Sequence, residues 1–347
     1  MARSCPGSRQ LAVVLTLTLS ACGVREAAPL WDFSVIQLNT PVRASMRGLS
    51  VVSNQVAWAS GTGGSVLRTI DGGVTWQLRA VPDADSLDFR DIEAFDSLNA
   101  YVLSAGPDGR IYRTADGGGT WALEFRNQVQ GAFFDCFDFF DPQTGLAMSD
   151  PVGGRFLLLA RGDSARWPEL PQVERPRADT AEAAFAASGT CLTIAGERAY
   201  LATGGGATAR VFWSEDRGRS WQAARTPVRA GAPSAGIFAL AFRDQNHGVA
   251  MGGDYQNPRA DALLAITHDG GRHWHVAGKT SYTSGAAWSP NGESLLAVGT
   301  SGTRFSRNHG LSWKMIDSLE YNAVQFADER VAYAVGPRGR IAKLLRR

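Results

Sequence analysis

Three acidic residues in the middle of the chain are candidates for catalysis. Asp135 and Glu182 fall at or just before predicted first strands of repeating units, and Asp150 follows a second strand. Two carboxyl groups about 5–9 Å apart across a bond are the arrangement with which glycosidases hydrolyse it. No feature of the sequence selects one pair. An equal alternative is that these carboxylates belong to a solvated rim of charged side chains that pair with one another.

A second polar set is suited to binding a partner. Its members fall in loops or at strand starts that we expect on one face of the molecule: Arg47, Arg90, Asp91, Asp150, Asp254 and Tyr255. As single residues they are most simply solvated surface groups. As a set around one opening, they are a candidate partner-binding site.

Several ligand classes lack support in the sequence. The five histidines (247, 268, 273, 275 and 309) show no metal-ligand spacing beyond His273-Trp-His275, which alternates along one strand. The glycine-rich stretch 203–210 lacks the lysine and following helix of a phosphate-binding loop, and no dinucleotide fingerprint is visible. We therefore expect no metal and no cofactor. No Lys/Arg run remains after the first 21 residues, so nucleic acid is a poor candidate partner.

A repeat in the sequence predicts the strands and loops that position these residues. Tryptophans recur at intervals of 39–54 residues, obtained by subtracting their positions: Trp31, Trp76, Trp121, Trp167, Trp221, Trp274 and Trp313. A period in this range indicates a repeat architecture. Short β-rich runs separated by Gly, Asp and Asn turns, with almost no helical periodicity, predict an all-β protein with four strands per repeat.

A polar turn precedes five of these tryptophans with the pattern S/T-x-D-x-G-x-x-W. It resembles the Asp-box, or BNR repeat, of β-propellers, and its matching residues are Asp71, Trp76, Asp116, Trp121, Asp216, Trp221, Asp269, Trp274, Asn308 and Trp313. Asp accepts backbone hydrogen bonds in turns, and Gly supplies a positive φ. These residues therefore have a structural role in hairpins. The third repeat keeps only the strand and Trp167.

The two ends of the chain predict how the ring closes. Residues 336–341 repeat the pattern of 106–111, and the chain ends six residues later, so the last repeat lacks its fourth strand. Trp31 has no turn in front of it, so a strand over 31–36 is expected to pair with 339–344. The prediction is a seven-bladed β-propeller whose ring is closed by an N-terminal strand and has no open edge.

The N-terminus has the features of an exported lipoprotein. Arg3 and Arg9 precede the apolar run 11–19, and the sequence Leu-Ser-Ala-Cys at 19–22 resembles a bacterial lipobox. We expect residues 1–21 to be a lipoprotein signal peptide, residues 22–30 a tether lipidated on Cys22, and residues 31–347 the propeller. An ordinary signal peptide is the alternative. The predicted location is the bacterial cell envelope, lipid-anchored on the extracytoplasmic side.

Cys136 and Cys191 occupy similar places in the first strands of the third and fourth repeats. Export permits a disulfide. The innermost strands of adjacent blades, however, are expected to lie too far apart for a Cα separation under about 7 Å. Buried free thiols are therefore the favoured expectation, with a disulfide as the alternative.

The segment 64–76, together with the turn spacing and seven repeats, resembles the photosystem II stability/assembly factor family of plants and cyanobacteria. The resemblance covers about residues 31–347. It implies a non-enzymatic scaffold that binds immature membrane-protein subunits through an arginine-rich patch, for which Arg47 and Arg90 are possible counterparts. The lipobox departs from the plant form.

Sialidases and related Asp-box glycosidases are the second resemblance. Sialidases have six blades and an arginine triad, whereas this sequence has seven repeats and no convincing third arginine. We therefore predict a monomeric, membrane-anchored scaffold that binds an exported protein or a membrane-protein segment through the face opposite the Asp-boxes. The alternative is a glycosidase acting on extracytoplasmic glycans with Asp135, Asp150 or Glu182.

Overall fold

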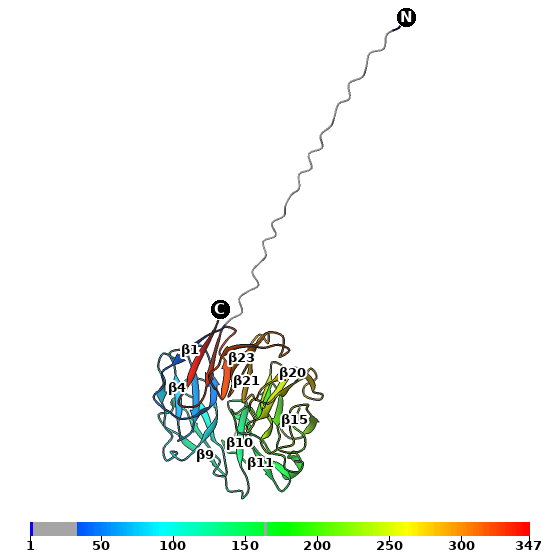
Figure 1. Cartoon of the computed structure of the whole chain (residues 1–347). Helices are drawn as coiled ribbons and strands as arrows, with labels where there is room; N and C mark the ends of the chain where they lie inside the picture. The colour runs from blue at the N-terminus through cyan, green and yellow to red at the C-terminus, as the bar shows by residue number, and fades with distance from the viewer. Residues whose placement is uncertain (3–32, 163–164) are drawn as a thin grey trace. The chain divides into compact units, whose positions relative to one another are not determined.

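The computed structural model describes residues 1–2, 33–162 and 165–347, and these form an all-β protein with seven antiparallel sheets (Figure 1). The first strands of successive sheets contact one another in the order β2, β6, β10, β13, β17, β21 and β25, and β25 returns to β2. This closed circuit is a seven-bladed β-propeller, as the sequence predicted. The tether, Trp31 and residues 3–21 of the expected signal peptide lie outside the described residues.

The first three blades comprise β2 (Met46–Val51), β3 (Ala57–Gly61), β4 (Val66–Thr69) and β5 (Gln77–Leu78); β6 (Phe89–Ala94), β7 (Ala100–Ser104), β8 (Arg110–Thr114) and β9 (Ala122–Arg126); and β10 (Phe134–Asp141), β11 (Thr144–Val152) and β12 (Arg155–Arg161). The next three comprise β13 (Leu192–Ala195), β14 (Arg198–Ala202), β15 (Arg210–Ser214) and β16 (Gln222–Arg225); β17 (Ala235–Phe242), β18 (Gly248–Asp254), β19 (Ala262–Thr267) and β20 (His275–Thr280); and β21 (Gly285–Trp288), β22 (Leu295–Gly299), β23 (Gly302–Ser306) and β24 (Lys314–Asp317). The seventh comprises β25 (Ala323–Phe326), β26 (Val331–Val335), β27 (Ile341–Arg346) and β1 (Phe33–Leu38).

The ring closes between the two ends of the chain. Strand β1 pairs antiparallel with β27, from Phe33 opposite Arg346 to Leu38 opposite Ile341, and the two strands lie side by side in Figure 1. The register places this pairing two residues beyond the predicted ranges. Closure by an N-terminal strand is therefore confirmed.

The third blade has three strands in its sheet. Where the other blades have a fourth strand, two isolated bridges join Leu159 to Glu169 and Arg155 to Arg177. A short 3₁₀ helix, Gln172–Glu174, follows in the long connection to blade four. No helix in the described residues is long and apolar enough to cross a bilayer.

The five polar turns connect the third and fourth strands of their blades and share one hydrogen-bond pattern. In the first, Asp71 accepts from the backbone N–H of Thr75 at 2.9 Å and from its hydroxyl at 2.6 Å, and Thr69 accepts from Gly73 N–H at 2.9 Å. Gly73 has a φ of 86°. The backbone N–H contact recurs in the other four turns, around Asp116, Asp216, Asp269 and Asn308. Asp269 contacts the His273 ring in place of a hydroxyl, and Asn308 donates from Nδ2 to the Ser312 hydroxyl. We call this end of the propeller the box face.

The tryptophans after these turns pack against neighbouring blades. Trp76 meets Tyr333 of blade seven edge-on at 6.3 Å between ring centroids, and Trp121 meets Trp58 of blade one at 6.5 Å. The core consists of clusters at such blade junctions, each drawing on two adjacent sheets. Each sheet therefore packs against the sheets on both sides of it. For this reason we expect the stability of each blade to depend on the closed ring.

Cys136 and Cys191 are joined by a disulfide with a Cα–Cα distance of 6.2 Å, so the expectation of free thiols is wrong. Both residues are fully buried. The first strands of adjacent blades converge toward the ring centre, and a register shift between Phe134 and Cys136 redirects the chain where β10 faces β13. The disulfide links blades three and four.

Candidate functional site

The face opposite the box face, which we call the mouth face, carries a pocket of about 490 Å³. Connections between second and third strands and between successive blades surround it. Its polar and aromatic lining comprises Arg47, Arg90, Phe133, Asp135, Asp150, Phe185, Phe238, Tyr255, Tyr282, Glu320 and Tyr321. We call this the mouth pocket. The structure thus brings together four of the six residues predicted to bind a partner: Arg47, Arg90, Asp150 and Tyr255.

Two arginines from blades one and two lie on one side of the pocket. Arg90 donates from Nε to Asp88 at 2.7 Å and from Nη1 to the Ala186 carbonyl at 3.1 Å, so its position is fixed. Arg47 is half-buried, and its Nε has no hydrogen-bond partner among the described residues. Burial and the neighbouring Arg90 charge lower the pKa of Arg47. Arg47 therefore has an unpaired Nε–H group, although the Asp88 and Glu320 charges partly offset the lowering of its pKa.

Two carboxyl groups from blade three line the same pocket. Asp135 in β10 is 1% exposed, and Asp150 lies within β11 beside a register shift. Burial and the nearby Asp150 charge raise the pKa of Asp135 well above its usual value. Burial also raises the pKa of Asp150, to about 6. The pair therefore releases its protons at higher pH than free aspartic acid does.

Aromatic rings form the wall on blades four to six. Phe185 stacks on Phe238 at 4.1 Å between centroids, and Tyr255 and Tyr282 contact Phe238 edge-on. Tyr255 is 48% exposed, so its ring projects from the enlarged loop between β18 and β19. The rings give the pocket an apolar side facing its charged side. No repeat motif in the sequence marked Phe185, Phe238 or Tyr282.

The structure places three predicted residues elsewhere. Asp254 lies beside the pocket lining and caps its own loop, where it accepts from Gln256 N–H and Asn257 Nδ2, both at 3.0 Å. Glu182 is buried against Arg210 and accepts from the Thr203 hydroxyl at 2.5 Å, so it does not join the other two candidate carboxylates.

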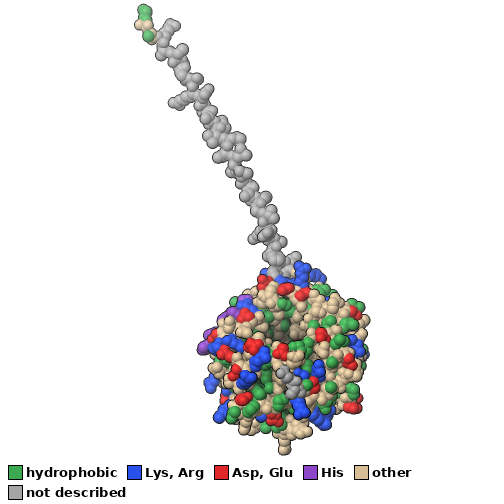
Figure 2. All heavy atoms as spheres, turned by 180° about the vertical axis from the view of Figure 1, so that it is seen from behind, with side chains coloured by type: hydrophobic (Ala, Val, Ile, Leu, Met, Phe, Trp, Pro, Cys, Tyr) green, Lys and Arg blue, Asp and Glu red, His purple; other side chains and the backbone are tan. Residues whose placement is uncertain are grey.

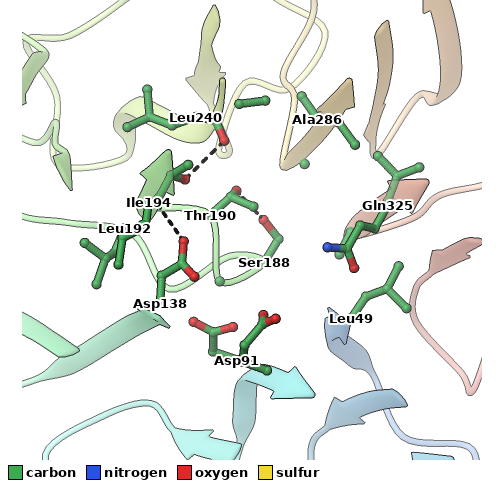
Figure 3. Close-up of a pocket in the computed structure, with 18 of the residues that line it drawn as sticks. Leu49, Asp91, Asp138, Ser188, Thr190, Leu192, Ile194, Leu240, Ala286 and Gln325 are labelled. Atoms are coloured by element: carbon green, nitrogen blue, oxygen red, sulfur yellow. Dashed lines mark hydrogen bonds between the residues drawn. The ribbon is translucent and has the colours of Figure 1, made fainter. Parts of the chain in front are cut away.

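Asp91, the third residue, lies in the central channel, where it lines a second cavity of about 330 Å³ (Figure 3). It accepts backbone N–H groups from Ile92 at 2.9 Å and from Phe137 of the next blade at 2.8 Å. Asp138 likewise accepts from Ile194 of the following blade at 2.6 Å. These carboxylates tie first strands together around the ring, so their hydrogen bonds are structural.

Three histidines converge at the box-face end of blades five and six. His247 and His268 are edge-on at 5.5 Å, and His309 lies 3.1 Å from an Arg243 nitrogen. Figure 2 shows histidines gathered at one edge of a surface where acidic and basic groups are otherwise mixed. Within the described ranges, no group of three or more His, Cys, Asp or Glu side chains has the geometry to hold a metal ion.

Comparison with known proteins finds solved structures that share the β-propeller fold. The chain is similar to a structure of YCF48 bound to a D1 peptide, with 15% identity and a TM-score of 0.65, over 92% of this chain and 98% of that one. It is also similar to YCF48 from Cyanidioschyzon merolae, with 16% identity and a TM-score of 0.64, over 89% and 98% of the two chains.

The WD40 propeller domain of Doa1 is similar at 12% identity and a TM-score of 0.58, over 90% of this chain and 97% of that domain. No protein-family model matches the sequence, and no curated protein matches it. At such low identities these similarities establish a shared propeller fold.

Proposed function

We propose that the protein is a non-enzymatic scaffold that holds a segment of a protein partner in the mouth pocket. The carrying observation is Arg47, a half-buried arginine that lines the pocket and whose Nε has no hydrogen-bond partner among the described residues. A buried N–H group without a hydrogen-bond partner is costly, so a ligand that accepts from Arg47 is the simplest explanation for its position. A carboxylate of a bound segment has the geometry that an arginine fork prefers.

The shape and chemistry of the pocket support a peptide as the occupant. Four of the five charged groups in the lining lie on blades one to three, and four of the six aromatic rings lie on blades four to six, which suits a chain carrying both polar and apolar side chains. The structurally similar propeller YCF48 has been solved bound to a D1 peptide, which is a precedent for this use of the fold. We propose an exported protein or a membrane-protein segment as the partner.

The test is site-specific photo-crosslinking in the cell envelope. A photoreactive phenylalanine analogue replaces Tyr255, and crosslinked products are compared between the parent protein and a variant carrying Arg47→Glu and Arg90→Glu. The expected result is one dominant adduct, mapped to one segment of one protein, that the double variant loses while keeping its melting temperature. A matched control carries Arg225→Glu and Arg338→Glu, because both residues are exposed and outside the pocket. Equal crosslinking in all three proteins would reject the proposal.

Glycoside hydrolysis is the second candidate, since Asp135 and Asp150 share one pocket and both have raised pKa values. A neutral acid beside a second carboxyl is the pairing that such enzymes use. The near-complete burial of Asp135 and the flanking arginines favour the scaffold. Hydrolysis of an aryl glycoside that Asp150→Asn abolishes would establish the enzyme instead.

We also propose that the protein is exported and anchored by lipid on Cys22, on the basis of the lipobox-like sequence at 19–22. A triacylated cysteine carries enough hydrocarbon for stable anchoring. The test is mass spectrometry of the mature N-terminus. A first residue beyond Cys22, without acyl chains, would reject the lipoprotein proposal while leaving the pocket proposal untouched.

A further inference from the structure

The acidic side of the mouth pocket has a chemistry distinct from that of the arginines. Resting on the partner binding proposed above, we propose that Asp135 and Asp150 form a second subsite that takes a Lys or Arg side chain of the bound segment. The pocket would then recognise a segment by two opposite charges, one at Arg47 and one at the acid pair. The partner's class is thereby narrowed to segments that carry a basic residue close to an acidic group.

The first observation is the unsatisfied oxygen of Asp135. Its side chain is 1% exposed, lines the pocket, and has an Oδ2 atom without a hydrogen-bond partner among the described residues. Buried polar atoms in folded proteins are nearly always paired. The nearby Arg90 charge lowers the pKa of this carboxyl, but its guanidinium donates hydrogen bonds to Asp88 and to the Ala186 carbonyl and none to Asp135. A donor from a ligand is the natural partner for the free oxygen.

The second observation is that Asp150 is held in a fixed orientation. Its Oδ1 accepts from Ala184 N–H at 2.8 Å, and its own N–H donates to the Phe133 carbonyl at 2.9 Å. The register shift between Ser149 and Pro151 turns the chain at this point. Because one oxygen of Asp150 is anchored, the other is available to the pocket without a cost for ordering the side chain.

The third observation is the ring beside the acids. Phe133 lines the pocket, is 36% exposed, and precedes β10, the strand that carries Asp135. Cations bind favourably over aromatic faces, most of all where water is excluded. An acid pair flanked by a ring is suited to a guanidinium, whose planar fork reaches two oxygens at once.

The charge state of the pair fits a cation better than an anion. Burial raises the pKa of both acids, and the Asp150 charge raises that of Asp135 further. A guanidinium between them would offset both effects, so binding should release a proton to the solvent. A bound carboxylate would instead take a hydrogen bond from the protonated acid and retain that proton.

The test is selection from a random heptapeptide library displayed on phage, using the full protein, two single variants of the pocket, the Arg47→Glu/Arg90→Glu double variant and one control. The parent protein should enrich peptides that combine Lys or Arg with Asp or Glu. Asp150→Asn should lose the basic preference and keep the acidic one, because Asn still accepts from Ala184. Arg47→Gln should do the reverse. Glu329→Gln, an exposed change on the box face, is the control and should select like the parent.

A titration of the best selected peptide provides a second readout. Replacing its basic residue by citrulline or norleucine should weaken binding by about tenfold or more. At pH 7.5, calorimetry in buffers of different ionisation enthalpy should report more proton release for the parent than for Asp150→Asn, because the Asp150 charge raises the pKa of Asp135. Enriched peptides without a basic residue would overturn the acidic subsite and leave the scaffold standing. Failure to enrich any peptide above Arg47→Glu/Arg90→Glu would overturn both.

Discussion

Glu93 differs from the other two carboxyls of the central channel in its hydrogen bonds. Asp91 and Asp138 each accept two backbone N–H groups, whereas Glu93 accepts only from the Ser50 hydroxyl at 3.4 Å. Burial raises the pKa of Asp91 to about 8 and that of Asp138 to about 7, and burial with the adjacent Asp138 and Asp91 charges raises that of Glu93 well above its usual value. Some of the carboxyl groups in the channel are therefore protonated at neutral pH.

This arrangement predicts stability that falls as pH rises. A carboxyl whose folded-state pKa exceeds its unfolded value contributes stability that is complete below the unfolded pKa, near 4, and is lost as pH rises through the folded pKa. The box-face residues have the opposite sign, because hydrogen bonds from Thr75 and Thr120 lower the pKa values of Asp71 and Asp116 to about 2. Their contribution is lost only below about pH 4. Maximum stability is therefore expected in mildly acidic solution.

Glu93→Gln is the specific residue-scale prediction. The substitution removes the least hydrogen-bonded of three crowded acids, and Gln still accepts from Ser50. The melting temperature at pH 8–9 should rise by roughly 2 °C or more, and the decline in stability between pH 5 and 9 should become shallower. Calorimetric melts across this range measure both effects. Glu329→Gln, on the exposed box face, serves as the control, and an equal change in the two variants would contradict the prediction.

At the scale of the strands, the disulfide links blades three and four covalently. It spans 55 residues and joins β10 to the residue just before β13. In the loop-entropy model, cross-linking a loop of this length stabilises the folded state by roughly 4 kcal/mol, and removal of native disulfides typically costs about 2–5 kcal/mol. The third blade also lacks the fourth strand that other sheets have. The bond therefore reinforces a blade whose sheet has three strands.

Replacing Cys136 and Cys191 by Ala should lower the unfolding free energy by roughly 2–4 kcal/mol, measured by urea denaturation of protein beginning at residue 23. The same parent protein has only these two cysteines. Thiol titration after denaturation without reductant should find no free thiol in the parent. Two free thiols per chain would show that the bond is absent in solution.

The pairing of β1 with β27 leads to a corresponding prediction for ring closure. Deleting residues 23–38 exposes the edge of β27 and uncovers Phe305, which Phe33 contacts at 5.0 Å between centroids. The melting temperature should fall sharply. Deleting only 23–31 leaves β1 intact and is the matched control. Equal melting of the two truncated proteins would contradict the role of β1.

The sequence predicted those elements that depend on local pattern. The polar turns and tryptophans fix the blades, and the missing fourth strand at the C-terminus pointed to closure from the N-terminus. The disulfide was missed because its geometry depends on convergence of strands from separate blades. The aromatic wall was missed because Phe185 and Phe238 belong to no repeated motif and meet only after the ring closes. Arg47 and Asp150 were found because the repeat places their loops on one face.

At the scale of the whole molecule, the first strand of the propeller begins at the box face and runs toward the mouth face. Strand β1 starts at Phe33 opposite Arg346, at the box-face end of β27, and runs to Leu38 near the mouth-face loop before Ile341. A lipid on Cys22 would therefore be attached to the propeller through its box face. Ten residues separate Cys22 from Phe33, a reach of at most about 35 Å. Lipid anchoring thus predicts that the mouth pocket opens away from the membrane, toward partners in the extracytoplasmic space.

Fluorophores on the two faces test this orientation. Asn291→Cys labels an exposed turn between β21 and β22 on the box face, and Arg338→Cys labels an exposed loop between β26 and β27 on the mouth face. In proteoliposomes containing lipid-borne quenchers, the Asn291 label should be quenched more strongly because it lies nearer the attachment point. Cys22→Ala should abolish quenching at both positions by releasing the protein. Stronger quenching at residue 338 would place the mouth against the bilayer, and a membrane-embedded segment would then be the partner reached by the pocket.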